Sequence, residues 1–207
     1  TDFAPSGLQK PRVRLPVVAV AGDAAQITFR LERSPQQTIY RLRVPFTAFD
    51  KGVEQRKKGD LGDHSIEELV VVNTDKSRAD TSSIACGKEN CFLVWDNETM
   101  GGVSAAAVDP GTAQLLWRDK FSKAGGHPTV AFDSAGNARV VWFEKGAIMT
   151  APITRAKVGV SAKVGRVSGT QPPAALVPGK TPGEWLVSWL DYEAGLLEPY
   201  VARFSCQ

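Results

Sequence analysis

The chain has 207 residues, of which 43% are hydrophobic and 23% charged, the composition of a soluble globular protein with a single domain. This length can bury a core without a metal or disulfide staple, and the composition excludes intrinsic disorder, collagen-like repeats and coiled coils. The net charge is +3, and the basic residues are scattered apart from Arg56, Lys57 and Lys58, so no nucleic-acid partner is expected. No apolar run reaches the roughly 18 residues of a membrane helix, so no membrane span is expected.

Strand-like runs follow one another from the N-terminus to the C-terminus. They lie at residues 17–20, 26–29, 39–44, 69–72, 91–95, 138–142 and 184–189. Each run is rich in β-branched or aromatic residues and is bounded by Gly, Asp, Pro or Ser. No segment of 12 or more residues shows a clean helical period, and the best helix candidate is one turn at 65–68. The sequence therefore predicts an all-β domain.

Three tryptophans mark an internal repeat. Trp95, Trp142 and Trp189 each close an apolar strand, and both intervals between them are 47 residues. An acidic residue follows each of them within two positions, namely Asp96, Glu144 and Asp191. Each copy reads as a short strand, a polar turn, a strand that ends in Trp, and a further strand.

A weaker copy stands at the N-terminus, with Phe29 in the place of the tryptophan. The interval from Phe29 to Trp95 is 66 residues, and the surplus fits a polar, charged insertion at about 50–66. A strand-like piece also precedes each copy. The unit is therefore four strands in roughly 45 residues, which is the size of a β-propeller blade.

The units resemble the β-propeller repeats of bacterial exported proteins. The most similar pattern is P-x-V-A-F-D-x-x-G-N-x-x-V-V-W, which is matched from Pro128 to Trp142. The units are also loosely similar to the Asp-box repeats of sialidase-like propellers, although no copy meets Ser-x-Asp-x-Gly-x-x-Trp. The resemblance covers most of the chain, and it implies a β-propeller fold while leaving the activity open.

We expect residues 1–207 to form a single propeller domain with four-stranded blades at about 16–75, 82–122, 128–170 and 171–207. The last copy lacks a fourth strand, so residues 10–15 are expected to complete it and to close a ring of four blades. The alternative is that these blades are half of a six- to eight-bladed propeller whose other part is absent from this chain.

The cysteines indicate a location outside the cytoplasm. Cys86 and Cys91 frame a tight turn and are predicted to form a disulfide across a hairpin, because a zinc site would need two more ligands and a redox site would prefer C-x-x-C. Disulfides persist outside the reducing cytosol, which favours a secreted, periplasmic or cell-surface protein. Cys206 is the odd cysteine, and it is either a small residue at a strand end or bonded to a further chain or missing segment.

Two groups of residues are candidates for ligand binding. Trp117 and Trp185 fall outside the repeat and are expected to make exposed contacts, whereas the repeated tryptophans are expected to pack between blades. Arg56, Lys57 and Lys58 are candidates because they lie in the insertion, and loops on a rigid scaffold often carry function. A solvated loop without a binding role would have the same composition.

No catalytic residue, metal site or cofactor is predicted. No segment resembles a calcium loop, and the two histidines, His64 and His127, have no G-x-S-x-G elbow to support a nucleophile.

The sequence supports two functional hypotheses. The first is a non-catalytic binding or scaffold propeller that contacts a protein or a glycan through loops on one rim, with no catalysis by this chain. The second is part of a glycan-processing enzyme of sialidase or lyase type, built on a larger propeller. In that case Arg30, Arg41 and Arg43 are candidates for holding a substrate carboxylate.

Overall fold

The computed structural model describes residues 12–33, 36–48, 69–71, 79–97, 101–112, 114–168, 174–192 and 195–205. Strands make up most of these residues and form four separate antiparallel sheets, each continuous in sequence. The predicted all-β architecture with repeated small sheets is confirmed. The proposed helical turn at 65–68 and the whole insertion at 50–66 lie outside the described residues.

Each sheet is one blade, and its strands are hydrogen-bonded in chain order. The first blade contains β1 (Arg12–Ala21), β2 (Ala24–Arg33), β3 (Gln36–Pro45) and β4 (Leu69–Val71). The second blade contains β5 (Ala79–Cys86), β6 (Cys91–Asn97), β7 (Val103–Val108) and β8 (Leu115–Ser122).

The third blade contains β9 (Gly125–Phe132), β10 (Ala138–Glu144), β11 (Ala147–Ile153) and β12 (Ala162–Arg166). The fourth blade contains β13 (Ala175–Pro178), β14 (Glu184–Asp191) and β15 (Glu198–Ser205). The repeated pattern of a strand, a Gly-containing turn and a strand ending in Trp therefore forms the first two strands of the second, third and fourth blades.

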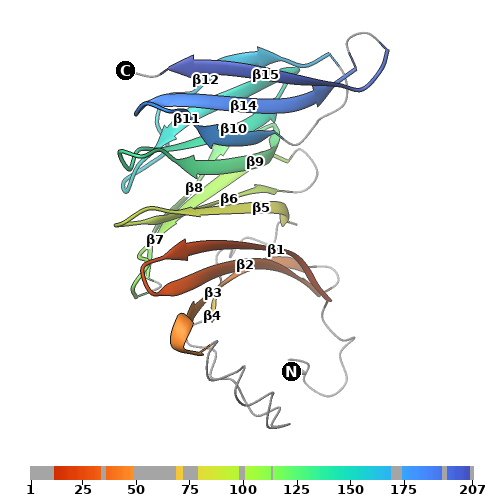
Figure 1. Cartoon of the computed structure of the whole chain (residues 1–207). Coiled ribbons are helices and arrows are strands. Elements are labelled where there is room, and N and C mark those ends of the chain that lie inside the picture. The colour runs from red at the N-terminus through yellow and green to blue at the C-terminus, as the bar shows by residue number, and fades with distance from the viewer. Residues whose placement is uncertain are drawn as a thin grey trace, which may run out of the picture.

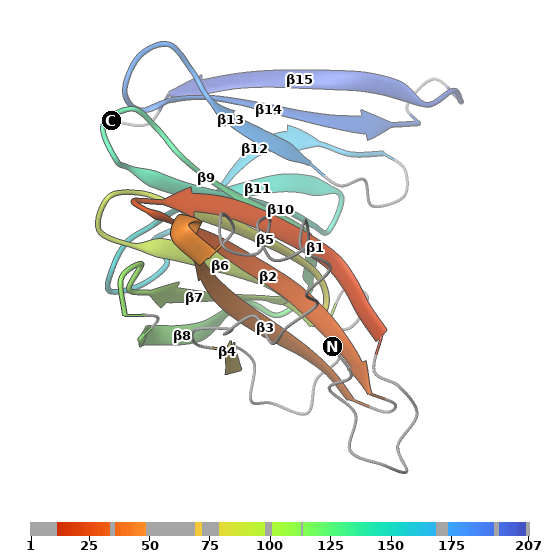
Figure 2. The same ribbon diagram turned by 60° about the horizontal axis from the view of Figure 1, so that its bottom comes forward.

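The blades are stacked face to face in sequence order. Figure 1 shows the first blade at the bottom of the stack and the fourth at the top. The first strands of successive blades contact one another, β1 with β5, β5 with β9 and β9 with β13. Figure 2 shows the successive sheets turned relative to one another, which is the radial arrangement of propeller blades.

Three hydrophobic clusters fill the spaces between successive blades. The cluster between the first and second blades includes Ile39 and Trp95, the next includes Phe92 and Trp142, and the last includes Phe143 and Trp189. Trp95, Trp142 and Trp189 are 1%, 2% and 7% exposed. Each repeated tryptophan therefore packs toward the preceding blade, as predicted for a residue that occurs once per blade.

The N-terminal strand lies differently from the sequence-based expectation. Residues 10–15 were expected to complete the last blade, but Arg12, Val13 and Arg14 pair with Glu32, Leu31 and Arg30 in the first blade. Because these residues continue β1 with only a register shift after Arg14, the hairpin with β2 is the more local pairing. Among the described residues, the fourth blade has three strands.

The predicted disulfide is present. Cys86 and Cys91 are bonded and form a directly paired position of the β5–β6 hairpin. The Gly87 N–H donates to the Asn90 carbonyl and closes the turn between them. Cys206 lies outside the described residues.

Candidate functional site

One edge of the stack gathers carboxylates at equivalent places in successive blades. We call this edge the carboxylate rim; it is the edge at which β6, β10 and β14 end, and it carries Asp96, Glu144 and Asp191. Because each of these strands ends two residues after its tryptophan, the repeat in the sequence places the three acidic groups on the same edge.

Asp96 joins the first strands of two blades. It is 1% exposed, and its two oxygens accept hydrogen bonds from the Thr81 N–H on β5 and the His127 N–H on β9. The pairing of β5 and β6 shifts register between Ala79 and Ser82, and this bulge at Thr81 frees its N–H for the carboxylate. Both oxygens of Asp96 are thus held by backbone, which is a structural role.

Glu144 and Asp191 make the same bond to the preceding blade. Ser122, at the end of β8, donates its hydroxyl hydrogen to Glu144 Oε2 at 2.8 Å. Ser168, just after β12, donates its hydroxyl to Asp191 Oδ1 at 3.0 Å and its N–H to Oδ2 at 2.8 Å. Each carboxylate therefore ties its own blade to the end of the previous one.

Glu144 differs from the other two carboxylates because one of its oxygens is not used. Its Oε2 accepts from the Trp142 indole N–H at 2.9 Å as well as from Ser122, and Oε1 has no hydrogen-bond partner among the described residues. The side chain is half-buried. Glu144 is therefore oriented by two donors while one oxygen can accept a hydrogen bond from a ligand.

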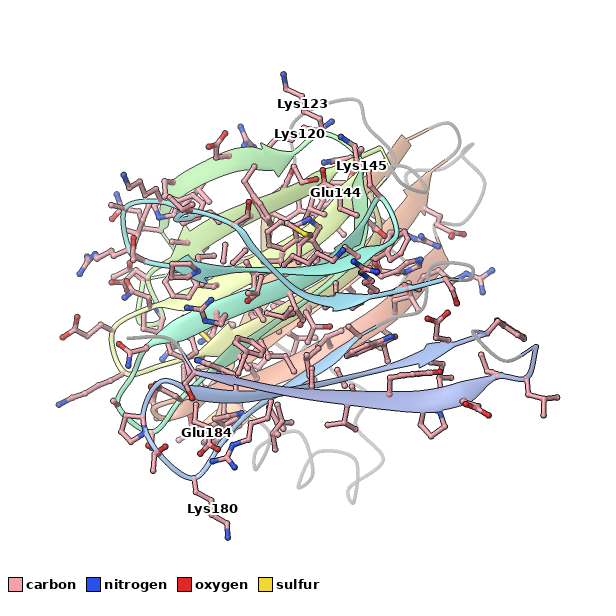
Figure 3. The ribbon with its side chains drawn as sticks, turned by 90° about the horizontal axis from the view of Figure 1, so that it is seen from above. Lys120, Lys123, Glu144, Lys145, Lys180 and Glu184 are labelled. Atoms are coloured by element: carbon pink, nitrogen blue, oxygen red, sulfur yellow. A yellow bond between two sulfur atoms is a disulfide. The ribbon has the colours of Figure 1, made fainter. Side chains whose placement is uncertain are left out.

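Three exposed lysines lie at the same end of the molecule as Glu144. Figure 3 shows Lys120, Lys123 and Lys145 at the same end of the molecule as Glu144, with Lys180 and Glu184 at the opposite end. Lys120 donates to the Gly101 carbonyl at 2.6 Å. The edge near Glu144 thus combines one open carboxylate oxygen with three exposed lysine side chains, a set that can bind hydroxyl, carbonyl and anionic oxygens.

Backbone strain lies close to this site. His127 and Lys145 have φ angles of 52° and 48°, in the left-handed region that non-glycine residues seldom adopt. Lys145 occupies the turn directly after Glu144, and the His127 N–H is bound to Asp96. Such conformations cost about 1–3 kcal/mol each and cluster at ligand sites.

The opposite edge carries two other buried carboxylates. Burial acts to raise the pKa of Asp133, but hydrogen bonds from the Asn137 side chain and from the N–H groups of Gly183, Asn137 and Ala135 outweigh burial and lower that pKa. The Thr181 N–H is the main cause that lowers the pKa of Glu184, with burial opposing it and Arg203 supporting it. Both groups organise turns, and Asp133 also bridges to the fourth blade through Gly183 at 2.8 Å.

The predicted ligand-binding residues are not brought together among the described residues. Trp185 is 1% exposed and packs in the core between the third and fourth blades, so the expectation of an exposed contact is wrong. The reason is strand alternation, since Trp185 lies on the same face as Val187 and Trp189. Trp117 is half-buried, and its indole N–H has no hydrogen-bond partner. Arg56, Lys57, Lys58 and His64 lie outside the described residues.

The three arginines proposed for the enzyme hypothesis lie on one face of the β2–β3 pair, where Arg30 is opposite Ile39, Arg41 opposite Thr28 and Arg43 opposite Gln26. Arg30 pairs with Glu32 at 2.6 Å and contacts the Ala79 carbonyl near the carboxylate rim. Arg41 is fully buried against the second blade, where it donates to the Asp109 carbonyl, and Arg43 pairs with Asp23 at the β1–β2 turn. All three are thus used in structural contacts.

Neither a metal site nor a membrane helix is found in the described part of the chain. No group of three or more His, Cys, Asp or Glu residues there is arranged to hold a metal ion. Within the same ranges, no helix has the length and apolar character to cross a membrane.

Comparison with known proteins gives similarity in structure without similarity in sequence. No family model and no curated protein sequence matches the chain. The catalytic domain of a GH62 alpha-L-arabinofuranosidase from Coprinopsis cinerea matches 97% of this chain with a TM-score of 0.52 and 8% identity. An alpha-L-arabinofuranosidase from Podospora anserina matches 100% of it with a TM-score of 0.51 and 6% identity.

A subtype N10 neuraminidase-like protein of A/little yellow-shouldered bat/Guatemala/060/2010 matches 96% of the chain, with a TM-score of 0.52 and 10% identity. The chain spans 66%, 67% and 59% of the length of these three structures. The chain therefore has a β-propeller fold.

Proposed function

We propose that this chain is part of a glycan-processing enzyme built on a larger β-propeller, and that the carboxylate rim holds the glycan. The likeness to two alpha-L-arabinofuranosidases over essentially the whole chain supports a glycan-related role. It favours the enzyme hypothesis over a non-catalytic scaffold. The disulfide between Cys86 and Cys91 supports a location outside the cytoplasm.

The observation that carries the choice of rim is the geometry of Glu144. Its carboxylate is fixed by Trp142 and Ser122 through one oxygen, and the other oxygen is available. A carboxylate in this state accepts hydrogen bonds from sugar hydroxyls, and general acid–base chemistry at a glycosidic bond requires a carboxyl group. Asp96 and Asp191 are held by backbone N–H groups and keep their structural role.

The experiment that tests this proposal is a glycan array followed by titration calorimetry with the best-bound oligosaccharide. Hydrogen bonds to a charged group contribute about 1.5–3 kcal/mol, so Glu144→Gln is expected to weaken binding about tenfold to a hundredfold. The matched control is Glu89→Gln, since Glu89 is exposed in the β5–β6 turn on the opposite edge.

Cleavage is measured on a nitrophenyl arabinofuranoside and on arabinoxylan. Binding that depends on Glu144, with or without cleavage by the chain alone, supports the proposed rim. Binding that Glu144→Gln leaves unchanged, or an array with no bound glycan, would contradict it.

A further inference from the structure

Basic side chains from two successive blades lie at the edge of the molecule that carries Glu144. Lys120 is on β8 of the second blade, and Lys123 is in the connection from β8 to β9. Lys145 is in the turn from β10 to β11, and Arg166 is at the end of β12. All four side chains are exposed, and Figure 3 shows the three lysines at the same end of the molecule as Glu144. We call these four residues the basic cluster.

Contacts between the second and third blades connect the basic cluster to Glu144. The Lys120 side chain crosses Gly102 beside Ser122, since a Cβ added at Gly102 would lie 2.6 Å from Lys120 Cε and would also meet the Ser122 carbonyl. Ser122 in turn donates its hydroxyl hydrogen to Glu144 Oε2 at 2.8 Å. Lys145 is the residue directly after Glu144. The cations and the open carboxylate oxygen therefore belong to one stretch of surface.

The turn that carries Lys145 has an unusual sequence for its backbone. Glu144 and Ala147 are directly paired, so Lys145 and Gly146 form a two-residue hairpin turn, with φ angles of 48° and 72°. Turns with two positive φ angles favour Asn-Gly or Asp-Gly, and a lysine at the first position is strained. Arg166 pairs with Ala147 and places a second cation beside this turn. Such strain is typical of positions that contact a ligand.

The charge of the basic cluster is not balanced by carboxylates. Among the described residues, none of its four side chains forms an ion pair. At the opposite edge, in contrast, Arg43 pairs with Asp23 and Arg203 pairs with Glu184. Several cations of one sign at one edge create a positive potential that attracts anions.

We propose that the glycan held at the carboxylate rim is anionic, with carboxylate or sulfate groups bound by the basic cluster while a neighbouring sugar hydroxyl donates to Glu144 Oε1. This inference rests on the proposed glycan site and adds the class of substrate. A neutral glycan would leave the four cations unused. Duplex DNA presents a continuous row of phosphates and no hydroxyl donor for the carboxylate of Glu144.

Titration calorimetry with three oligosaccharides of matched length tests the class of substrate. They are an oligogalacturonate, which carries carboxylates, a heparin fragment, which carries sulfates, and a neutral arabino-oligosaccharide. One of the acidic ligands is expected to bind at least about tenfold more tightly than the neutral one, and its affinity is expected to fall as salt is added. The tighter of the two acidic ligands identifies the anionic group. A DNA duplex is the fourth ligand and is expected to bind at least about tenfold more weakly than that acidic oligosaccharide.

A pair of double variants tests the residues. Lys123→Gln combined with Lys145→Asn is expected to weaken binding of the acidic oligosaccharide about threefold to thirtyfold. Because asparagine suits a positive φ better than lysine does, this variant is expected to unfold at no lower a temperature than wild type. The matched control is Lys88→Gln combined with Lys180→Gln, which removes the same charge from exposed positions at the opposite edge and is expected to bind as wild type does.

The outcomes separate this inference from the proposed function. Equal affinity for acidic and neutral ligands, no binding of either acidic ligand, or equal losses in the two double variants would overturn the anionic substrate. In that case, neutral binding that depends on Glu144 would still support the proposed rim. Acidic binding that depends on the basic cluster but is unchanged by Glu144→Gln would support the anionic substrate and contradict the role of Glu144. DNA that binds as tightly as the acidic ligands would overturn the inference in favour of a nucleic-acid surface.

Discussion

Buried polar side chains hold the ends of the blades together in this protein. Asp96, Asp133 and Asp191 are 1%, 7% and 2% exposed, and each accepts hydrogen bonds from the blade next to its own. Burying a carboxylate is costly unless it is hydrogen-bonded, and here backbone N–H groups supply most of the donors. These residues therefore make the packing of apolar sheets specific in register and angle.

The stability of the protein is expected to fall in acid because of such groups. The folded-state pKa of Asp133 lies below its ordinary value, so its contribution is fully present above the unfolded pKa of about 4 and is lost as the pH falls through the folded pKa. Asp133→Asn is expected to cost about 1–3 kcal/mol at neutral pH and to lose less stability between neutral and acid pH than wild type does.

Urea unfolding over a series of pH values measures this difference. Asp23→Asn is the control, because the Asp23 side chain is 84% exposed. Parallel stability curves for wild type and Asp133→Asn would show that this carboxylate is not the titrating group.

Two glycines lie directly under aromatic rings of a neighbouring blade. The Trp189 ring lies over Gly165 on β12, and the Phe132 ring lies over Gly87 in the β5–β6 turn. Since a Cβ at either glycine would fall within 3 Å of ring carbons, the glycines here are required by side-chain contact between blades.

We expect Gly165→Ala to destabilise the protein by about 1–3 kcal/mol, as overpacking does in other cores. The Cβ would meet the Trp189 ring at 2.7 Å, and that ring is stacked on Tyr200. Gly111→Ala is the matched control, because its Cβ makes only an ordinary contact at 3.4 Å. Thermal or urea unfolding of both variants measures this difference. Equal losses of stability in Gly165→Ala and Gly111→Ala would contradict the expectation.

At the scale of the whole molecule, the inner and outer blades differ in how they are covered. The second and third blades are packed on both faces, whereas the first and fourth each have one face that no described strand covers (Figure 1). In a stack of repeated units, the free energy of unfolding is approximately the sum of the intrinsic stability of each unit and the contributions of the contacts between neighbouring units. The two outer blades should therefore open more readily than the inner ones.

Hydrogen exchange followed by mass spectrometry is expected to show this difference directly. Backbone amides of β6 and β10 should exchange more slowly than those of β2 and β15. Opening an outer blade breaks packing contacts with one described neighbouring blade, whereas opening an inner blade breaks contacts with two. Uniform exchange across all four blades would contradict the expected order.

Local features of this protein could be predicted from its sequence because they depend on short-range pattern. The interval of 47 residues between tryptophans, the alternation within strands and the Cys86–Cys91 turn predicted blades, interface tryptophans and a disulfide, all of which the structure confirms. The partners of each face, in contrast, depend on residues far apart in the chain. Pattern alone did not reveal that Trp185 is buried, that residues 12–14 pair with β2, or that Arg41 and Arg43 are engaged by Asp109 and Asp23.

The same distinction explains the candidate site. The sequence placed an acidic residue after each tryptophan, but it could not show which oxygens would be occupied. The donors Ser122, Ser168 and the His127 N–H belong to neighbouring blades and reach the carboxylates only when the blades stack. Glu144 alone keeps an open oxygen because its donors, Trp142 and Ser122, both bind Oε2. That choice is made by tertiary packing, since hydrogen-bond geometry between separate sheets has no counterpart in local sequence.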